Sequence, residues 1–199
     1  MREIAAIILA AGRASRFRAQ SPLPTKLTAL WNGQPLVRHV AQAALASKAR
    51  PVIVVTGFAS ADVVAALAGL PLVLVHNAGF ADGLAGSLKA GIAAVPVHCA
   101  GALVLLGDMP QVRMSTLDAM IAAFTASRQS ALVPVHEGQP GNPVLLGRAL
   151  FGAIASLTGD QGARKLRAAQ NAGIMAWPCD DPGILADIDT PGALAQMQD

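Results

Sequence analysis

The feature that most constrains the fold is a short apolar run that recurs along the first half of the chain. Such runs occupy residues 2–10, 52–57, 72–76 and 102–106, and helical patterns separate them at 34–45, 60–67 and 83–94. Apolar runs of this length without polar alternation are typical of parallel strands that are buried on both faces. The alternation of strand and helix therefore predicts an α/β protein with a mostly parallel sheet flanked by helices.

The last third of the chain departs from this pattern. Apolar segments at 131–135 and 142–146 flank the turn-forming run 137–141. This arrangement predicts two strands joined by a turn, which would add a small antiparallel portion to the sheet. Further helices are expected at 149–156 and from residue 159, and a strand is expected at 174–177.

Capping residues and breakers indicate where several elements begin. Ser60 and Ser115 precede helical patterns and are expected to cap them. Thr190 followed by Pro191 predicts the cap and first residue of a short C-terminal helix. The segment 16–30 contains two prolines and is expected to be a loop.

The composition fits one globular domain over residues 1–199. Apolar residues make up 53% of the chain and charged residues only 14%, which favours a packed core over disorder. No apolar run is long enough to cross a bilayer, and the first residues are unlike a secretory leader, so we expect a cytoplasmic protein without membrane contacts. Cys99 and Cys179 lack metal-ligand spacing and have no predicted role.

The charge balance favours small anionic ligands. The formal net charge is +3 and no long block of lysine and arginine occurs, so a nucleic-acid surface is not expected. The four histidines, His39, His76, His98 and His136, have no zinc-binding spacing. Metal chemistry would therefore depend on carboxylates.

Glycine-rich and polar segments lie where ligands usually bind in such folds. Gly12–Arg16 follows the first strand, Gly83–Ser87 begins a helix, and Asp108 follows the run 102–106. Ligands of parallel α/β sheets bind beyond the carboxyl ends of the strands. Glycine lets backbone N–H groups approach a phosphate, and arginines add charge-assisted donors. A glycine turn after the first strand is, however, also the ordinary start of an α/β domain.

Asp108 is the leading candidate for a magnesium ligand. Mg²⁺ is typically held by one or two carboxylates together with substrate phosphates, so Asp108 with either Asp187 or Asp189 would suffice. Lys26 could neutralise a triphosphate or be an ordinary solvated lysine. The aspartates could likewise be turn or capping residues.

Motifs of several other enzyme classes are absent from the sequence. The chain contains no G-x-S-x-G, no H-E-x-x-H and no glycine-lysine-serine phosphate loop. The glycine that follows Gly12 is Gly33, so the dinucleotide-binding pattern G-x-G-x-x-G does not occur at the first turn.

Four separated segments together resemble the nucleotidyltransferases of molybdenum cofactor biosynthesis, most closely the cytidylyltransferase branch. They are Leu9–Gly12 with Ser15, Arg16 and Lys26; Gly83–Leu88; Leu106–Pro110; and Asp187–Pro191. Gly141–Val144 and Gly159–Ala163 also resemble segments of the family. The similarity spans nearly the whole chain.

This resemblance implies a three-layer Rossmann-like fold with a nucleotide-binding half at about 1–110 and an acceptor-binding half at about 111–199. It implies transfer of CMP from CTP to the phosphate of molybdopterin, with Mg²⁺ as cofactor and pyrophosphate as the second product. A molybdoenzyme or its chaperone would be a partner that receives the product.

The resemblance also implies roles for individual residues. Arg16, Lys26 and Asp108 would be catalytic, Asp108 and Asp189 would bind the metal, and Leu9, Ala10, Ala11, Gly12, Gly83 and Ser87 would bind the nucleotide, with Asn142 and Asp160 as candidates for the acceptor. Ala11 bears on base choice, because guanylyl-transferring relatives usually have glycine at the matching position.

The chain departs from the family pattern after Arg16. Phe17 and Arg18 stand where methionine and glycine are usual, and residues 19–25 lengthen the path to Lys26. A longer segment is also seen in cytidylyltransferases that act on sugar or polyol phosphates. The alternatives are therefore GTP as nucleotide, another phosphate as acceptor, Arg13 or Arg18 as a phosphate contact, and a non-catalytic chaperone that binds the cofactor.

Overall fold

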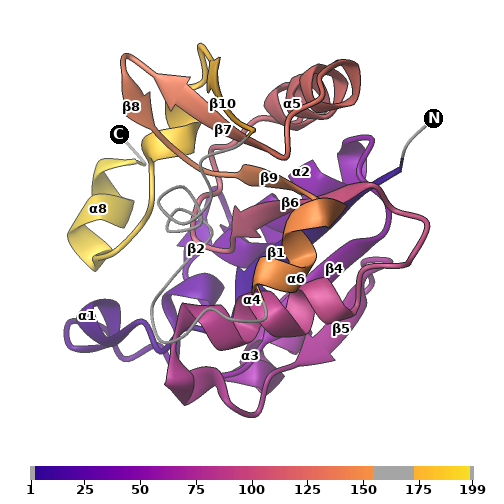
Figure 1. Ribbon diagram of the computed structural model, residues 1–199. Helices are drawn as coiled ribbons and strands as arrows, with labels where there is room; N and C mark the ends of the chain where they lie inside the picture. The colour runs from indigo at the N-terminus through magenta and orange to yellow at the C-terminus, as the bar shows by residue number, and fades with distance from the viewer. Residues whose placement is uncertain (1–2, 155–172, 198–199) are drawn as a thin grey trace.

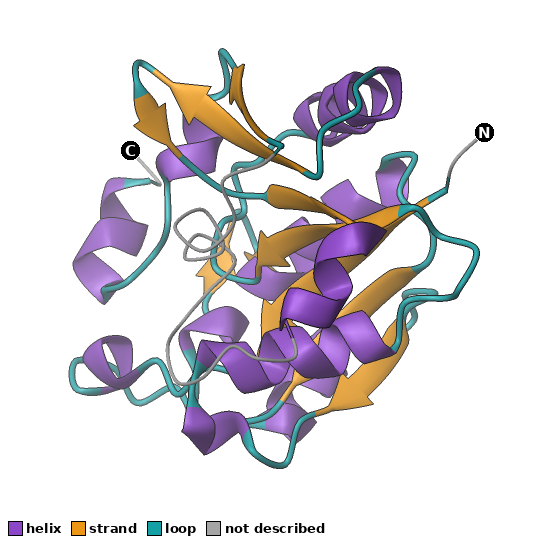
Figure 2. Ribbon diagram, in the orientation of Figure 1, coloured by secondary structure: helices purple, strands orange, loops and turns teal. Residues whose placement is uncertain are grey.

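The computed structural model describes residues 3–154 and 173–197, and its centre is a mostly parallel sheet between two helical layers (Figures 1 and 2). In these residues the sheet has eight strands in the order β10-β7-β9-β6-β1-β4-β5, with β8 paired to β7. The strands are β1 (Ile4–Ala10), β4 (Val52–Thr56), β5 (Val73–His76), β6 (Gly101–Leu106), β7 (Ala131–His136), β8 (Gln139–Pro140), β9 (Val144–Gly147) and β10 (Ile174–Pro178). The predicted fold class is confirmed.

Helices cover both faces of this sheet, and Figure 1 shows α4 and α6 on the near face. The α-helices are α1 (Ser15–Arg18), α2 (Leu36–Ala46), α3 (Ser60–Ala66), α4 (Leu84–Ala93), α5 (Met114–Ala126), α6 (Phe151–Ile154) and α8 (Pro191–Gln196). Short 3₁₀ helices are η1 (Lys26–Thr28), η2 (Phe80–Asp82), η3 (Arg148–Leu150) and η5 (Pro182–Leu185), and β2 (Leu30–Trp31) pairs with β3 (Gln34–Pro35) in a separate small sheet. No helix among the described residues has the length and apolar character needed to span a membrane.

Strand β1 lies at the centre of the core, and all seven of its residues are buried. Because side chains alternate along a strand, Ile8 packs into the cluster that includes residues of α2 and α5, whereas Ile7 packs into the cluster that includes residues of α4. Helix α4 can approach closely because Gly91 faces β1: a Cβ there would lie 2.5 Å from Ile7 Cγ2. Burial of both faces explains why the sequence of β1 lacks polar alternation.

The antiparallel portion predicted from the last third is present. Strand β9 pairs antiparallel with both β6 and β7, whereas β1, β4, β5 and β6 pair in parallel. Since β9 lies between β6 and β7, it joins the strands of the first half of the chain to those of the second.

The segment 16–30 contains regular secondary structure, so the prediction of a loop was wrong for part of it. It contains α1, η1 and the start of β2, and Phe17 within α1 is only 2% exposed. Phe17 packs in a cluster with Ala29, Leu36 and Ile188. Contacts with distant apolar residues thus stabilise a segment whose prolines suggested irregular structure.

Two of the three predicted helix caps are wrong. Ala59 precedes α3, and the Ser60 hydroxyl donates instead to Thr56 Oγ1 at 2.9 Å. At α5 the N-cap residue is Arg113, whose backbone N–H donates to the distant carboxylate of Asp181 at 3.0 Å. A tertiary contact therefore takes the place of local capping at α5.

The third predicted cap, at the C-terminal helix, is confirmed. Thr190 Oγ1 accepts from the backbone N–H of Ala193 at 3.1 Å, and Pro191 is the first residue of α8. A backbone N–H at the first helical position has no acceptor within the helix, so the missing N–H of proline costs no hydrogen bond there.

Candidate active site

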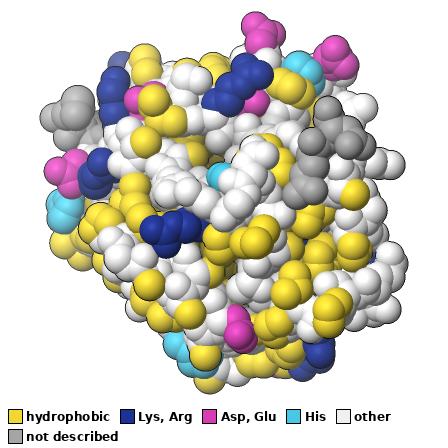
Figure 3. All heavy atoms as spheres, turned by 180° about the vertical axis from the view of Figure 1, so that it is seen from behind, with side chains coloured by type: hydrophobic (Ala, Val, Ile, Leu, Met, Phe, Trp, Pro, Cys, Tyr) yellow, Lys and Arg dark blue, Asp and Glu magenta, His cyan; other side chains and the backbone are white. Residues whose placement is uncertain are grey.

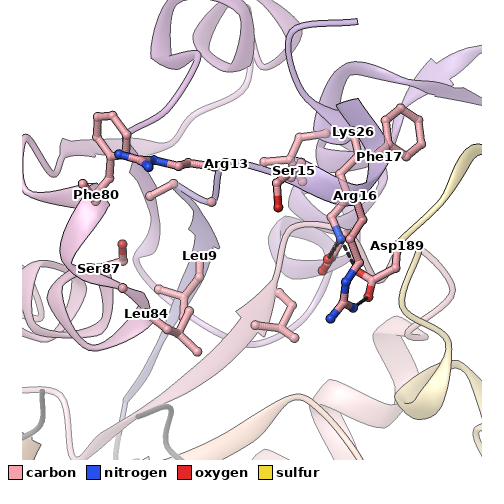
Figure 4. Close-up of a pocket in the computed structure, with 18 residues that line it drawn as sticks. Leu9, Arg13, Ser15, Arg16, Phe17, Lys26, Phe80, Leu84, Ser87 and Asp189 are labelled. Atoms are coloured by element: carbon pink, nitrogen blue, oxygen red, sulfur yellow. Dashed lines mark hydrogen bonds and ion pairs between the residues drawn. The ribbon is translucent and has the colours of Figure 1, made fainter. Parts of the chain in front are cut away.

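A cavity of about 570 Å³ opens at the carboxyl ends of β1 and β6 (Figure 4). Segments from both ends of the chain enclose it. Its lining consists of Leu9, Ala11, Gly12, Arg13, Ala14, Ser15, Arg16, Phe17, Lys26, Leu27, Phe80, Ala81, Gly83, Leu84, Ser87, Leu106, Asp108 and Asp189. In Figure 4 a group around Phe80, Leu84 and Ser87 lies on one side of the cavity, and Lys26, Arg16 and Asp189 lie on the other.

The turn after β1 forms the wall between these two groups. Ala11 is 3% exposed and its carbonyl accepts from the backbone N–H of Phe58 at 3.2 Å. Gly12 is exposed, and a Cβ built on it would have no neighbour within 4 Å. Packing among the described residues therefore does not require glycine at this position, which lines the cavity.

The charged side of the cavity is a compact cluster of two cations and two carboxylates. Lys26 Nζ lies 2.6 Å from Asp108 Oδ2 and 2.7 Å from Asp189 Oδ1. Arg16 Nη1 lies 2.9 Å from the other oxygen of Asp189. Arg16 comes from α1 and Lys26 from η1, whereas Asp108 follows β6 and Asp189 precedes α8, so the cluster combines segments distant in the sequence.

The contacts in this cluster favour the charged forms of Lys26 and Asp189. Burial alone would disfavour the ammonium of Lys26, but the carboxylates of Asp108 and Asp189 outweigh it and raise the pKa of Lys26 above its usual value. The hydrogen bond from Lys26 is the main cause that lowers the pKa of Asp189, and Arg16 adds to it. Lys26 and Asp189 are therefore a charged pair at neutral pH.

The opposite side of the cavity is formed by the start of α4. Gly83 precedes the helix with φ +97°, a backbone conformation that favours glycine. Leu84 begins the helix, and Ser87 in its first turn is 4% exposed and accepts a hydrogen bond from Asn77 Nδ2 at 3.1 Å. The N-terminal backbone N–H groups of α4 thus lie beside the cavity, where the helix dipole favours an anion.

Phe80 is a lining residue that the sequence analysis missed. The guanidinium of Arg13 lies 5.7 Å from the centre of the Phe80 ring, and that of Arg18 lies 4.6 Å from the centre of the Phe58 ring. The two rings contact each other edge to face with centres 6.0 Å apart. The available signal was an aromatic residue just before the Gly83 helix start. Arg13, weighed as an alternative phosphate contact, does line the cavity.

The structure brings together most but not all of the predicted residues. Leu9, Ala11, Gly12, Arg16, Lys26, Gly83, Ser87, Asp108 and Asp189 line the cavity, whereas Ala10 is buried in β1 and is not part of the lining. Of the two alternatives for a second carboxylate, Asp189 lines the cavity and Asp187 is exposed outside it. Asn142 is outside the lining too; its backbone N–H donates to Ile184. Asp160 lies outside the described residues.

Two curated proteins are similar to this chain along most of its length. It is 29% identical to the molybdenum cofactor cytidylyltransferase of Escherichia coli, over 96% of this chain and 93% of that protein. It is also 32% identical to the bifunctional protein GlmU of Paracidovorax citrulli, over 90% of this chain but only 38% of that protein.

Solved structures agree with this similarity. Rv0371c of Mycobacterium tuberculosis superimposes with a TM-score of 0.82 and 27% identity, covering 99% of this chain and 98% of that one. A structure of the same mycobacterial protein in complex with manganese has a TM-score of 0.77 and 26% identity, and covers 98% of each chain. The sequence profile of the MobA-like NTP transferase domain matches residues 6–174. The chain therefore belongs to the MobA-like NTP transferase family and is a nucleotidyltransferase.

Proposed function

We propose that this protein transfers CMP from CTP to the phosphate of molybdopterin and releases pyrophosphate. The observation that carries the proposal is the convergence of Arg16, Lys26, Asp108 and Asp189 in one cavity. The name of the Escherichia coli relative, a molybdenum cofactor cytidylyltransferase, supports the choice of nucleotide and acceptor.

The chemistry needs positioning and charge compensation more than a catalytic base. A phosphate monoester is largely dianionic near neutral pH. One of its oxygens attacks the α-phosphorus of CTP, a new P–O bond forms, and the bond from the α-phosphorus to the bridging oxygen breaks as pyrophosphate leaves. Lys26 and Arg16 stabilise the charge that develops on this leaving group. Backbone N–H groups beside Gly12 hold the phosphates in place.

Asp108 and Asp189 fit a divalent metal. Their oxygens converge on a shared cation, the ammonium of Lys26, and hard carboxylate oxygens are the ligands that Mg²⁺ prefers. Asp108 and Asp189 would hold Mg²⁺, which would supply charge neutralisation and orientation. The manganese complex of the mycobacterial relative is consistent with a divalent metal in this family.

Ala11 supports CTP rather than GTP. It is buried in the cavity wall, and its methyl group would lie 2.8 Å from a Cβ on Gly57, so the wall is closely packed here. Guanylyl-transferring relatives usually have glycine at the matching position, so alanine here favours CTP. Asn142 and Asp160 remain predicted acceptor contacts, and a molybdoenzyme or its chaperone remains a predicted partner.

A turnover assay with CTP or GTP, Mg²⁺ and molybdopterin tests the proposal. The expected result is pyrophosphate release with CTP and little with GTP. Absence of release with both nucleotides would contradict the reaction, and a preference for GTP would contradict the base assignment. Tight cofactor binding without turnover would indicate a chaperone instead.

A second candidate acceptor is a sugar or polyol phosphate. The observation that favours it is the extended segment between Arg16 and Lys26, in which α1 and η1 are separated by residues 19–25. This segment borders the cavity at Phe17 and Lys26. Turnover with such acceptors but not with molybdopterin would select this candidate.

A further inference from the structure

The two proposed metal ligands already share a cation that belongs to the chain itself. Lys26 Nζ stands between Asp108 Oδ2, at 2.6 Å, and Asp189 Oδ1, at 2.7 Å. The remaining oxygen of Asp189 pairs with Arg16 Nη1 at 2.9 Å. The charges of the two carboxylates are therefore matched by two cationic side chains before any ligand enters.

This arrangement opposes the binding of a metal ion on its own. The side chains of Lys26 and Asp108 are only 12% and 17% exposed, so their charges are screened less than charges at the open surface. A divalent ion that joined this cluster would meet the ammonium at short range, and both carboxylates of the cluster are already paired with cations.

A nucleoside triphosphate in the cavity would change the charge pairing of this cluster. Its phosphates carry several negative charges and offer Lys26 and Arg16 new partners within the same cavity. When Lys26 pairs with the phosphates, the oxygens of Asp108 and Asp189 become free to hold a divalent ion. The exchange replaces one cation by another at the two carboxylates and leaves neither of them without a partner.

Building on the function proposed above, we propose that Lys26 holds the place of the divalent metal in the ligand-free protein. The metal then binds with the nucleotide, not before it. Lys26 serves two partners in turn: the carboxylates when the cavity is empty and the phosphates when it is filled. Metal and nucleotide are thereby coupled through one side chain, so each raises the affinity for the other.

Binding of Mn²⁺ alone, measured by the loss of the free-ion electron paramagnetic resonance signal, tests this coupling. Lys26→Met is expected to bind Mn²⁺ about tenfold or more tightly than the wild type, within the usual range for interacting sites. Lys48→Met removes the same charge from an exposed position outside the cavity and should match the wild type. Adding Asp108→Asn to Lys26→Met should abolish the gain. A folded Lys26→Met variant without tighter binding would overturn the proposal.

A measurement on the wild type covers the case in which Lys26→Met does not fold. The ammonium resonance of Lys26 in a ¹⁵N-lysine spectrum, assigned with the charge-conserving Lys26→Arg, should stay in place with Mg²⁺ alone and shift with Mg²⁺ and CTP. An equal shift with Mg²⁺ alone would overturn the proposal. The Mn²⁺ arm uses neither nucleotide nor acceptor, so a failure of CTP turnover would refute the proposed function without affecting this result.

Discussion

The backbone N–H of Ile188 donates to the carbonyl of Asp108 at 3.2 Å. This bond ties the segment before α8 to the end of β6, and the side chain of Ile188 is fully buried beside Phe17 and Leu36. Asp189 follows directly, so its carboxylate is brought to Lys26 opposite Asp108. In Figure 1, α8 near the C-terminus lies on the same side of the molecule as α1 near the N-terminus.

Asp108→Asn is expected to lower turnover on the order of 100-fold while nucleotide binding partly survives. The amide keeps the shape of the side chain but cannot supply the negative charge that a metal needs. Pyrophosphate release and CTP binding by calorimetry measure the two effects separately. Unchanged turnover would remove Asp108 from the proposed metal site.

Asp189→Asn and Asp187→Asn form a matched pair, because the two carboxylates are two positions apart in the sequence but only Asp189 lines the cavity. Turnover is expected to fall by at least about tenfold for Asp189→Asn, which weakens the anchors of Lys26 and Arg16. The exposed Asp187→Asn should behave as the wild type. Equal losses in both variants would contradict the choice of Asp189 as the second carboxylate.

Gly12→Ala is expected to weaken nucleotide binding about tenfold without lowering the unfolding temperature. Its added methyl would meet no atom of residues 3–154 or 173–197 within 4 Å, so the expected loss comes from contact with the ligand. Gly152→Ala, also without a neighbour within 4 Å but outside the cavity lining, is the control and should bind normally. Normal CTP affinity in Gly12→Ala would show that the phosphates do not approach this turn.

The ion pair of Asp189 with Lys26 makes stability depend on pH. The hydrogen bond from Lys26 holds the pKa of Asp189 below its usual value, so the contribution is present above the unfolded pKa of about 3.9 and is lost as the pH falls through the folded pKa. Lys26 has a raised pKa because its two carboxylates outweigh the effect of burial. Its contribution is present below its unfolded pKa of about 10.4 and is lost as the pH rises through the folded value.

The unfolding temperatures of the wild type and Asp189→Asn, measured across the pH range, test this dependence. The difference between them should be largest at neutral pH and should shrink as the pH falls below the unfolded pKa of about 3.9 and through the lower folded pKa of Asp189. A difference of constant size down to about pH 2 would contradict the pairing.

Asp181→Ala is expected to lower the free energy of unfolding by about 3 kcal/mol, since it leaves buried donors without an acceptor. The Asp181 carboxylate is 3% exposed and accepts from the backbone N–H groups of Arg113 and Gly183 and from the Thr116 hydroxyl. Chemical denaturation measures the change. The exposed neighbour Asp180→Ala is the control, and equal stability of the two variants would argue against this anchor.

Basic side chains do not gather into a patch on the face of the molecule opposite to that in Figure 1. On the face shown in Figure 3, the lysine and arginine side chains lie apart from one another, and several of them lie beside acidic side chains. The charged residues discussed above instead meet within the cavity, where Arg16 and Lys26 both reach Asp189. The charged cluster of Arg16, Lys26, Asp108 and Asp189 thus lies at the carboxyl ends of β1 and β6.

The sequence alone determined the layered α/β fold, because strands buried on both faces must be apolar throughout and the helices between them carry their own periodicity. It also predicted that Gly12 and Asp108 lie at strand ends and that Thr190 and Pro191 begin a helix, since turns, strand ends and caps depend on neighbouring residues. Only the tertiary structure decided between Asp187 and Asp189 as the carboxylate that lines the cavity. It also placed Lys26 between Asp108 and Asp189 and brought Phe80 to the cavity wall. These relationships depend on contacts between segments distant in sequence, such as the hydrogen bond from Ile188 to Asp108, and no local pattern encodes them.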